Sequence, residues 1–156
     1  MKKGGIVRKD QGWMSLKASL AQLGDYDVSV GVLGEAEPYE SGSPVTVAEV
    51  ATFNEFGTRT IPERSFIRST IADKKLAWTR MARTILRGKT KIATQNMYQA
   101  LGMRAQADVQ NTIVRLVDPP NAPSTIKAKK SDNPLIDTGR LKNSITYEIK
   151  PKGAGD

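Results

Sequence analysis

The fold of this chain is decided by the stretch Asn54-Glu55-Phe56-Gly57-Thr58-Arg59-Thr60-Ile61-Pro62-Glu63-Arg64-Ser65-Phe66-Ile67-Arg68. Gly57 is the residue type that ends a helix in the left-handed conformation at no steric cost. Pro62 fixes its own φ and disfavours a helical conformation for Ile61. We therefore predict a loop of defined shape between two helices. The stretch contains no catalytic constellation, which favours a surface fitted to another protein.

A helix is predicted just before this loop. Thr46-Val47-Ala48-Glu49 has the capping-box pattern, in which a hydroxyl and a carboxylate satisfy free backbone amides at a helix start. The helix runs from Val47 to about Phe56. Its apolar positions, expected to face the core, are Val47, Val50, Ala51 and Phe53.

Two long helices are predicted after the loop. Helical spacing resumes at Phe66 and continues to about Leu86, with an apolar stripe of Ile67, Ile71, Trp78, Ala82 and Ile85. Gly88 is expected to interrupt it. A second stripe repeats every four residues up to a helix end near Leu116, at Met97, Leu101, Ala105, Val109, Ile113 and Val117. Pro119 and Pro120 then stop that helix.

Strands are predicted near both ends of the chain. Apolar residues alternate with polar ones from Tyr26 to Val32 and again from Ile145 to Ile149, which is typical of strands with one buried face. We expect the two to pair in an antiparallel sheet. A further amphipathic helix is predicted over residues 12–23, with Trp13 as a candidate interface anchor.

These elements predict one α+β domain over residues 12–150, in which a small antiparallel sheet packs against the two long helices and extended loops connect the elements. Residues 1–11 are expected to be a flexible arm, and residues 151–156 a flexible tail. Residues 118–136 are rich in Pro, Lys, Ser and Asn, and we predict a long loop there.

The composition restricts the chemistry. The 156 residues include no Cys and no His, which excludes disulfides and nucleophile pairs that need a thiolate or imidazole. Glu49 and Glu55 share one helix but lie about 120° apart around it, so they do not converge. We predict no enzyme and no cofactor. No apolar run approaches the roughly 18 residues of a membrane span, so no membrane partner is expected.

The net charge of +8 is compatible with an anionic partner. The exposed basic candidates are Arg80, Arg83 and Arg87 in the first long helix and Lys127, Lys129 and Lys130 in the 118–136 loop. They are compatible with a solvated surface, with an acidic protein partner, or with nucleic-acid phosphates. No recognisable DNA-binding motif accompanies them.

Two separated motifs resemble the neck, tail-completion or putative tail-component proteins of long-tailed bacteriophages. The first is the helix ending in Asn54-Glu55-Phe56-Gly57 followed by Ile61-Pro62-Glu63-Arg64-Ser65-Phe66-Ile67-Arg68, and the second is Leu135-Ile136-Asp137-Thr138-Gly139-Arg140-Leu141 before a strand. The order and spacing match over about residues 26–150. Ser65 departs from the pattern, since many members have a second Pro there.

The resemblance implies a structural virion protein at the head–tail junction that forms a ring, with six subunits expected, around the DNA channel. It implies assembly in the bacterial host cytoplasm and, as partners, head-completion proteins, tail-terminator or tail-tube proteins and the passing genomic DNA. The alternative is a basic DNA-binding accessory or assembly protein. Interface or loop residues are expected at Asn54, Glu55, Phe56, Gly57, Arg59, Ile61, Pro62, Arg64, Phe66, Arg68, Asp137, Thr138, Gly139 and Leu141.

Overall fold

The structure is a computed structural model of the whole chain, and it describes residues 24–34, 37–87, 91–129 and 131–153. Several predictions lie outside the described part: the flexible arm of residues 1–11, the helix of residues 12–23, the interruption at Gly88, Lys130 and residues 154–156 of the tail. The fold class is α+β, as the sequence predicts. In chain order the elements are β1 (Tyr26–Val32), α2 (Val47–Phe56), α3 (Ile67–Leu86), α4 (Lys91–Arg115), α5 (Pro123–Lys129), α6 (Arg140–Asn143) and β2 (Ile145–Pro151).

The two strands form an antiparallel pair in which Tyr26 lies opposite Pro151 and Val32 lies opposite Ile145. Because side chains alternate along a strand, Val28, Val30 and Val32 share the face that also carries Ile145 and Ile149. The opposite face is polar. Lys152 donates a further backbone hydrogen bond to Asp25, so the pairing extends into the residues predicted to be a flexible tail.

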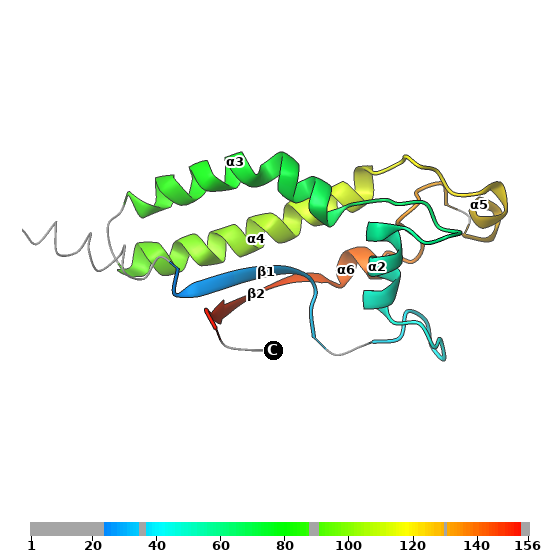
Figure 1. Cartoon of the computed structure of the whole chain (residues 1–156), viewed down its shortest axis with the longest axis horizontal. Helices are drawn as coiled ribbons and strands as arrows, with labels where there is room; N and C mark the ends of the chain where they lie inside the picture. The colour runs from blue at the N-terminus through cyan, green and yellow to red at the C-terminus, as the bar shows by residue number, and fades with distance from the viewer. Residues whose placement is uncertain (1–23, 35–36, 88–90, 130, 154–156) are drawn as a thin grey trace, which may run out of the picture.

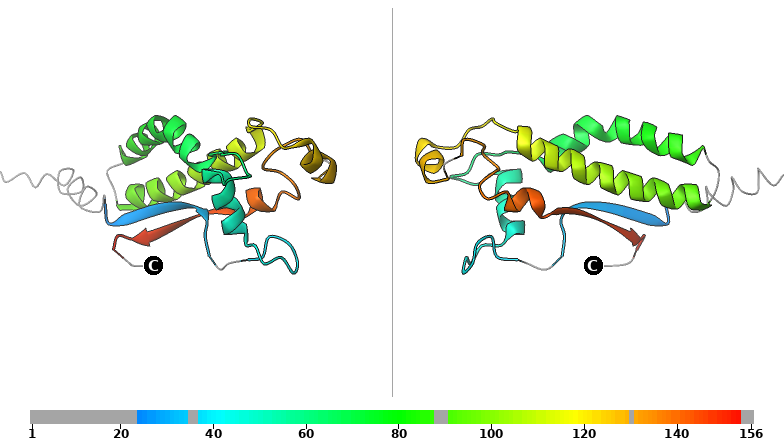
Figure 2. Two further views of the ribbon diagram at one scale, coloured as in Figure 1. Left: turned by 45° about the vertical axis from the view of Figure 1, so that its right-hand side comes forward. Right: turned by 180° about the vertical axis from the view of Figure 1, so that it is seen from behind.

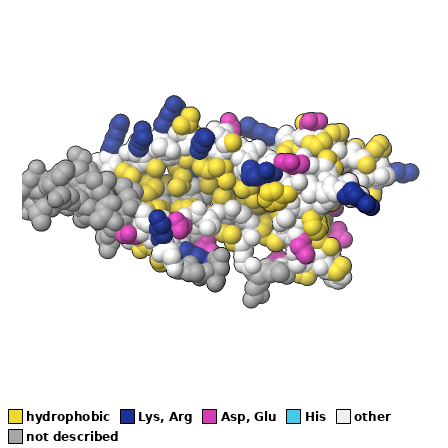
Figure 3. All heavy atoms as spheres, in the orientation of Figure 1, with side chains coloured by type: hydrophobic (Ala, Val, Ile, Leu, Met, Phe, Trp, Pro, Cys, Tyr) yellow, Lys and Arg dark blue, Asp and Glu magenta, His cyan; other side chains and the backbone are white. Residues whose placement is uncertain are grey.

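Helix α4 lies between α3 and the sheet, so the molecule has three layers (Figure 1). Figure 2 shows the same order from behind, with α2 and α5 at one end of the long helices. The core is built where α4 meets α2, α6 and the start of β2, and its fully buried side chains include Phe66, Val109, Ile113 and Ile145. Basic side chains stand along the outer side of α3 (Figure 3).

Helix α4 is fastened to both neighbours by specific contacts. On the sheet side, a Cβ added to Gly102 would lie 2.2 Å from the ring of Tyr147, so only glycine permits this approach. On the α3 side, the buried Asp108 accepts hydrogen bonds from Trp78 Nε1 (2.8 Å) and Arg104 Nε (2.9 Å). The hydrogen bonds from Trp78 and Arg104 oppose the effect of burial and lower the pKa of Asp108.

Several sequence predictions need correction. Helix α4 begins at Lys91 and ends at Arg115, so Val117 lies beyond the helix and is exposed instead of continuing the stripe. Ile71 is 41% exposed, so the predicted apolar stripe of α3 is not buried along its whole length. Phe53 is 37% exposed because α2 turns one side to the core. The predicted 118–136 loop contains α5, which its Pro- and Lys-rich composition did not indicate.

Candidate functional site

Glu55, in the last turn of α2, accepts hydrogen bonds from the end of the loop that follows. Its side chain accepts five hydrogen bonds of 2.8–3.0 Å, from the hydroxyl of Ser65, the backbone amides of Phe66, Ile67 and Arg68, and Nε of Arg68. Those amides are the first donors of α3, whose own N-terminal residue provides no side-chain cap. Glu55 therefore caps α3 from another helix, where the positive end of the helix dipole favours a carboxylate.

The electrostatics of Glu55 follow from these bonds. The residue is only 4% exposed. Burial by itself raises the pKa of a carboxyl group, but the hydrogen bonds from Ile67, Arg68 and Ser65 outweigh it and lower the pKa below the usual value. Glu55 is therefore held ionised, as a structural anion. A general acid would need a raised pKa, so this geometry does not suit acid catalysis.

Arg64 is the buried cation of the same loop and is 5% exposed. Its Nε donates to the carbonyl of Pro119 (2.7 Å), and its Nη2 donates to the carbonyl of Pro120 (2.9 Å). Its backbone amide donates to the carbonyl of Asn54 (2.7 Å), and Nη1 reaches the Asn54 side chain at 3.4 Å. Arg64 thus joins the loop after α2 to the segment after α4, with the guanidinium fork matched to two carbonyls.

The tip of the loop, residues 57–63, is shaped by its own polar groups. Gly57 has a positive φ of 72°, but its ψ of 171° lies outside the left-handed helical region that the sequence predicted. A Cβ there would lie 3.0 Å from the amide of Glu63. The Thr58 hydroxyl accepts hydrogen bonds from the amides of Thr60 and Ile61. Arg59 and Pro62 are exposed at this tip. The side chains free to meet a partner are therefore at the tip.

The second motif is fixed in the same way. Asn133 donates to the carbonyl of Val114 (2.9 Å) and accepts from the amides of Leu135 and Ile136, so it fastens this segment to the end of α4. Gly139 has a φ of 80° at the start of α6. Leu141 is buried in the core, Asp137 is half-buried and Thr138 is exposed.

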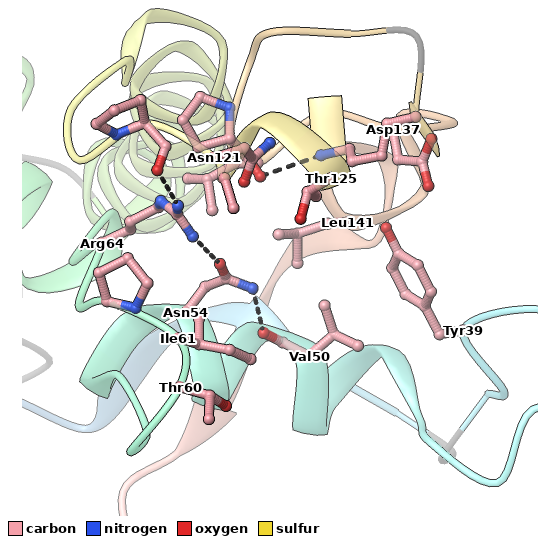
Figure 4. A pocket seen from close by; sticks show the side chains of 16 residues that line it. Tyr39, Val50, Asn54, Thr60, Ile61, Arg64, Asn121, Thr125, Asp137 and Leu141 are labelled. Carbon is pink, nitrogen blue, oxygen red and sulfur yellow. Dashed lines mark hydrogen bonds between the residues drawn. The ribbon is translucent and has the colours of Figure 1, made fainter. Parts of the chain in front are cut away.

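The two motifs, far apart in the sequence, meet around one open cavity of about 390 Å³. Figure 4 shows Asn54, Ile61 and Arg64 on one side and Asp137 and Leu141 on the other. We call α2, the loop at residues 57–66 and residues 133–141 the motif end of the molecule. The cavity walls combine apolar groups with polar ones, of which Asn54, Arg64 and Lys129 bond to backbone carbonyls of the chain.

Four of the predicted interface or loop residues turn their side chains inward. Glu55, Arg64, Phe66 and Leu141 are buried within the chain itself. Contact with a partner is left to the exposed members of the set. Among these, Phe56 is 61% exposed and its ring lies 4.6 Å from the guanidinium carbon of Arg68.

The basic candidates divide into two groups. Arg80 and Arg83 are exposed on α3, and Arg87 is exposed at its C-cap. No ion pair involves these three residues within the described part of the chain. Lys127 is also exposed. Lys129 instead donates to the carbonyls of Asn133 and Pro134, both at 3.2 Å, and burial lowers its pKa. Lys129 thus joins the end of α5 to the segment that follows it.

Sequence reasoning missed Asn133 and the carbonyls of Pro119 and Pro120. An Asn two residues before an apolar Leu-Ile pair is a signal for a side chain that bonds the following amides, and it could have indicated Asn133. Nothing local marks the proline carbonyls, because their partner is Arg64, on a distant segment.

Within residues 24–34, 37–87, 91–129 and 131–153, no group of three or more acidic side chains is arranged to hold a metal ion. In the same residues, no helix has the length and apolar character needed to cross a lipid bilayer. Comparisons with protein-family models, with curated proteins and with solved structures found no match.

Proposed function

We propose that this chain is a structural subunit of the head–tail junction of a long-tailed bacteriophage, where it forms a ring around the DNA channel and joins tail to head. The observation that carries the proposal is the convergence of the two family-like motifs on one cavity. Within these motifs, the hydrogen bonds of Glu55 and Arg64 fix the shape of the loop. A subunit that must present one surface to its neighbours needs this rigidity.

The geometry of the motif end supports a binding role without catalysis. Its buried ions, Glu55 and Arg64, are held by several hydrogen bonds each, and its exposed residues include Phe53, Phe56, Arg59 and Pro62. Exposed aromatic and arginine side chains are common anchors of protein interfaces. The shape of the loop tip, and no chemical step, is then the property on which assembly depends.

Electron cryo-microscopy of virions from the phage that encodes the chain tests this proposal. Reconstruction of the neck with relaxed symmetry is expected to show the chain in a closed ring between head and tail tube. A Pro62→Ser variant is expected to fold but to yield few joined particles, whereas Pro44→Ser, an exposed proline in another turn, serves as the control. Virions that lack the chain would refute the structural role.

A second candidate function is binding of DNA by the chain as an accessory or assembly factor. The observation that favours it is the exposed set of Arg80 and Arg83 on α3 and Arg87 at its C-cap, which form no ion pair within the described residues. Phosphate contacts of this kind make affinity fall steeply as salt rises. Retardation of duplex DNA at low salt, lost in the Arg80→Ala, Arg83→Ala double variant, would support it.

A further inference from the structure

The outer edge of β1 has no partner strand within the described residues. Lys152 donates its amide to the carbonyl of Asp25, and such hydrogen-bonded pairs recur at every second residue of an antiparallel ladder. The odd-numbered residues of β1 therefore bond to β2, whereas Val28, Val30 and Val32 turn their amides and carbonyls away from it. No hydrogen bond of the described part of the chain uses these outward groups. An edge of this kind is a template for one more strand.

The matching position on β2 is covered. Ile145, opposite Val32, turns its carbonyl outward, and that carbonyl accepts hydrogen bonds from the side chains of Gln106 (2.9 Å) and Gln110 (3.2 Å). Both glutamines belong to α4. This end of β2 thus has its partners in the helix, whereas no described side chain bonds to the outward groups of Val30 and Val32.

An apolar groove of about 290 Å³ runs along the open edge of β1 at its C-terminal end, where α2 lies (Figure 1). Four consecutive residues, 30–33, line it, which places it along the edge of the strand, because residues on one face would alternate. Its apolar walls include Val30, Val32, Leu33, Ala51, Phe56 and Ile67. Its polar members Thr52 and Glu55 bond to groups of the chain itself.

An extended peptide segment is the ligand that matches both features. Its backbone supplies the alternating donors and acceptors that the edge needs, and an apolar side chain fills the groove. Residues 1–23 are the one stretch outside the described residues that is long enough to supply a strand. Within it, Ile6-Val7 is the pair of adjacent β-branched residues, the type that strands favour.

This N-terminal segment, residues 1–23, is long enough to reach the groove from the start of β1. The seven residues of β1 span roughly 23 Å at about 3.3 Å per residue. If residues 12–23 form the predicted helix, that helix spans roughly 18 Å. Residues 8–11 add about 13 Å when they are extended. A segment that returns along β1 in this way runs antiparallel to it, which is the more stable pairing.

We infer that Ile6-Val7 of the N-terminal segment adds a short antiparallel strand to the outer edge of β1 in the same molecule. The added strand bonds to the outward groups of Val30 and Val32, and one of its two apolar side chains enters the groove. The tether selects the chain's own segment over that of another copy, because a short linker gives an effective concentration on the order of millimolar. The inference is independent of the proposed function.

Hydrogen exchange of single amides, followed by nuclear magnetic resonance, tests this strand. Val30 and Val32 are expected to exchange at least tenfold more slowly in the wild type than in an Ile6→Asp, Val7→Asp double variant. The amides of Ser29 and Gly31 bond to β2 and are expected to exchange at the same slow rate in both proteins. They are the internal control for the integrity of the sheet.

A matched control variant changes the same segment without touching the apolar pair. Lys2→Ser, Lys3→Ser is expected to keep the slow exchange of Val30 and Val32. A synthetic peptide with the native sequence of residues 3–11, added in excess to the double variant, is expected to restore the protection, and a peptide with the two Asp substitutions is not. Circular dichroism of each variant checks that the fold is retained.

The other outcomes overturn the inference. Fast exchange of Val30 and Val32 in the wild type shows that no strand covers the edge. Equally slow exchange in the wild type and the double variant shows that something other than Ile6-Val7 covers it. Protection that appears only as the protein concentration rises assigns the strand to another copy. Because the test uses the isolated chain, its failure leaves the proposed function standing, and virions without a ring of this chain leave the strand unaffected.

Discussion

The motif end and the layered half of the molecule, formed by α3, α4 and the sheet, are held together in different ways. In the motif end, the two buried ions Glu55 and Arg64 form hydrogen bonds with backbone groups of the loops, which have no partners in a helix or sheet. In the layered half, apolar packing and the close approach of Gly102 to Tyr147 position regular elements. The comparison teaches that irregular backbone needs multivalent polar side chains, because every buried amide and carbonyl requires a partner.

The largest expected effect comes from removing the anion of the motif end. Glu55→Ala leaves the first amides of α3 and the Ser65 hydroxyl without their acceptor. Because each buried donor left unsatisfied costs about 1–3 kcal/mol, we expect a loss of roughly 3 kcal/mol or more in the free energy of unfolding, measured by urea denaturation.

Glu63→Ala is the matched control for that experiment. Glu63 also bonds Arg68, at 2.7 Å, but it is exposed and accepts no backbone amide of α3. Little change is expected, because exposed ion pairs contribute little. Equal losses in the two variants would show that the Arg68 ion pair, and not the cap of α3, stabilises the motif end.

The next effect tests the layered half. Gly102→Ala places a methyl group 2.2 Å from the Tyr147 ring and forces α4 and β2 apart. Overpacking of this kind costs about 1–3 kcal/mol. Gly31→Ala in β1, where an added Cβ meets nothing within 4 Å, is the control. A second change, Tyr147→Val, made in the Gly102→Ala protein, is expected to restore part of the stability, and thermal unfolding of the wild type and the three variants would measure this.

Glu55 and Gly102 also show how far the sequence predicts the structure. Helix α2, its capping box and both strands follow from local patterns, and the structure confirms them. The role of Glu55 depends on amides more than ten residues later, and that of Gly102 depends on a strand at the other end of the chain. No local pattern encodes such contacts. Phe53 was predicted to be buried because periodicity identifies an apolar position but not whether a neighbour covers it.

A smaller effect is expected in the pH dependence of stability, which tests the contribution of Glu55 to the motif end. The pKa of Glu55 is lower in the folded chain than its usual value of 4.5. Its contribution is therefore fully present above about pH 4.5 and is lost as pH falls through the folded pKa. The Glu55→Gln variant is expected to lose less stability than wild type between pH 6 and pH 3. Parallel pH profiles from thermal unfolding would contradict a role for this anion.

The smallest effect compares two carboxylate caps within the motif end. Glu49 caps α2 through the exposed capping box with Thr46, and the amide and hydroxyl of Thr46 lower its pKa. Thr46→Ala is expected to cost about 1 kcal/mol, typical of an exposed N-cap. Water can replace the lost bond at this exposed site, whereas Glu55 is only 4% exposed and accepts five hydrogen bonds. Urea denaturation should therefore rank Thr46→Ala well below Glu55→Ala, and the reverse order would mean that α2, rather than the buried anion, organises the motif end.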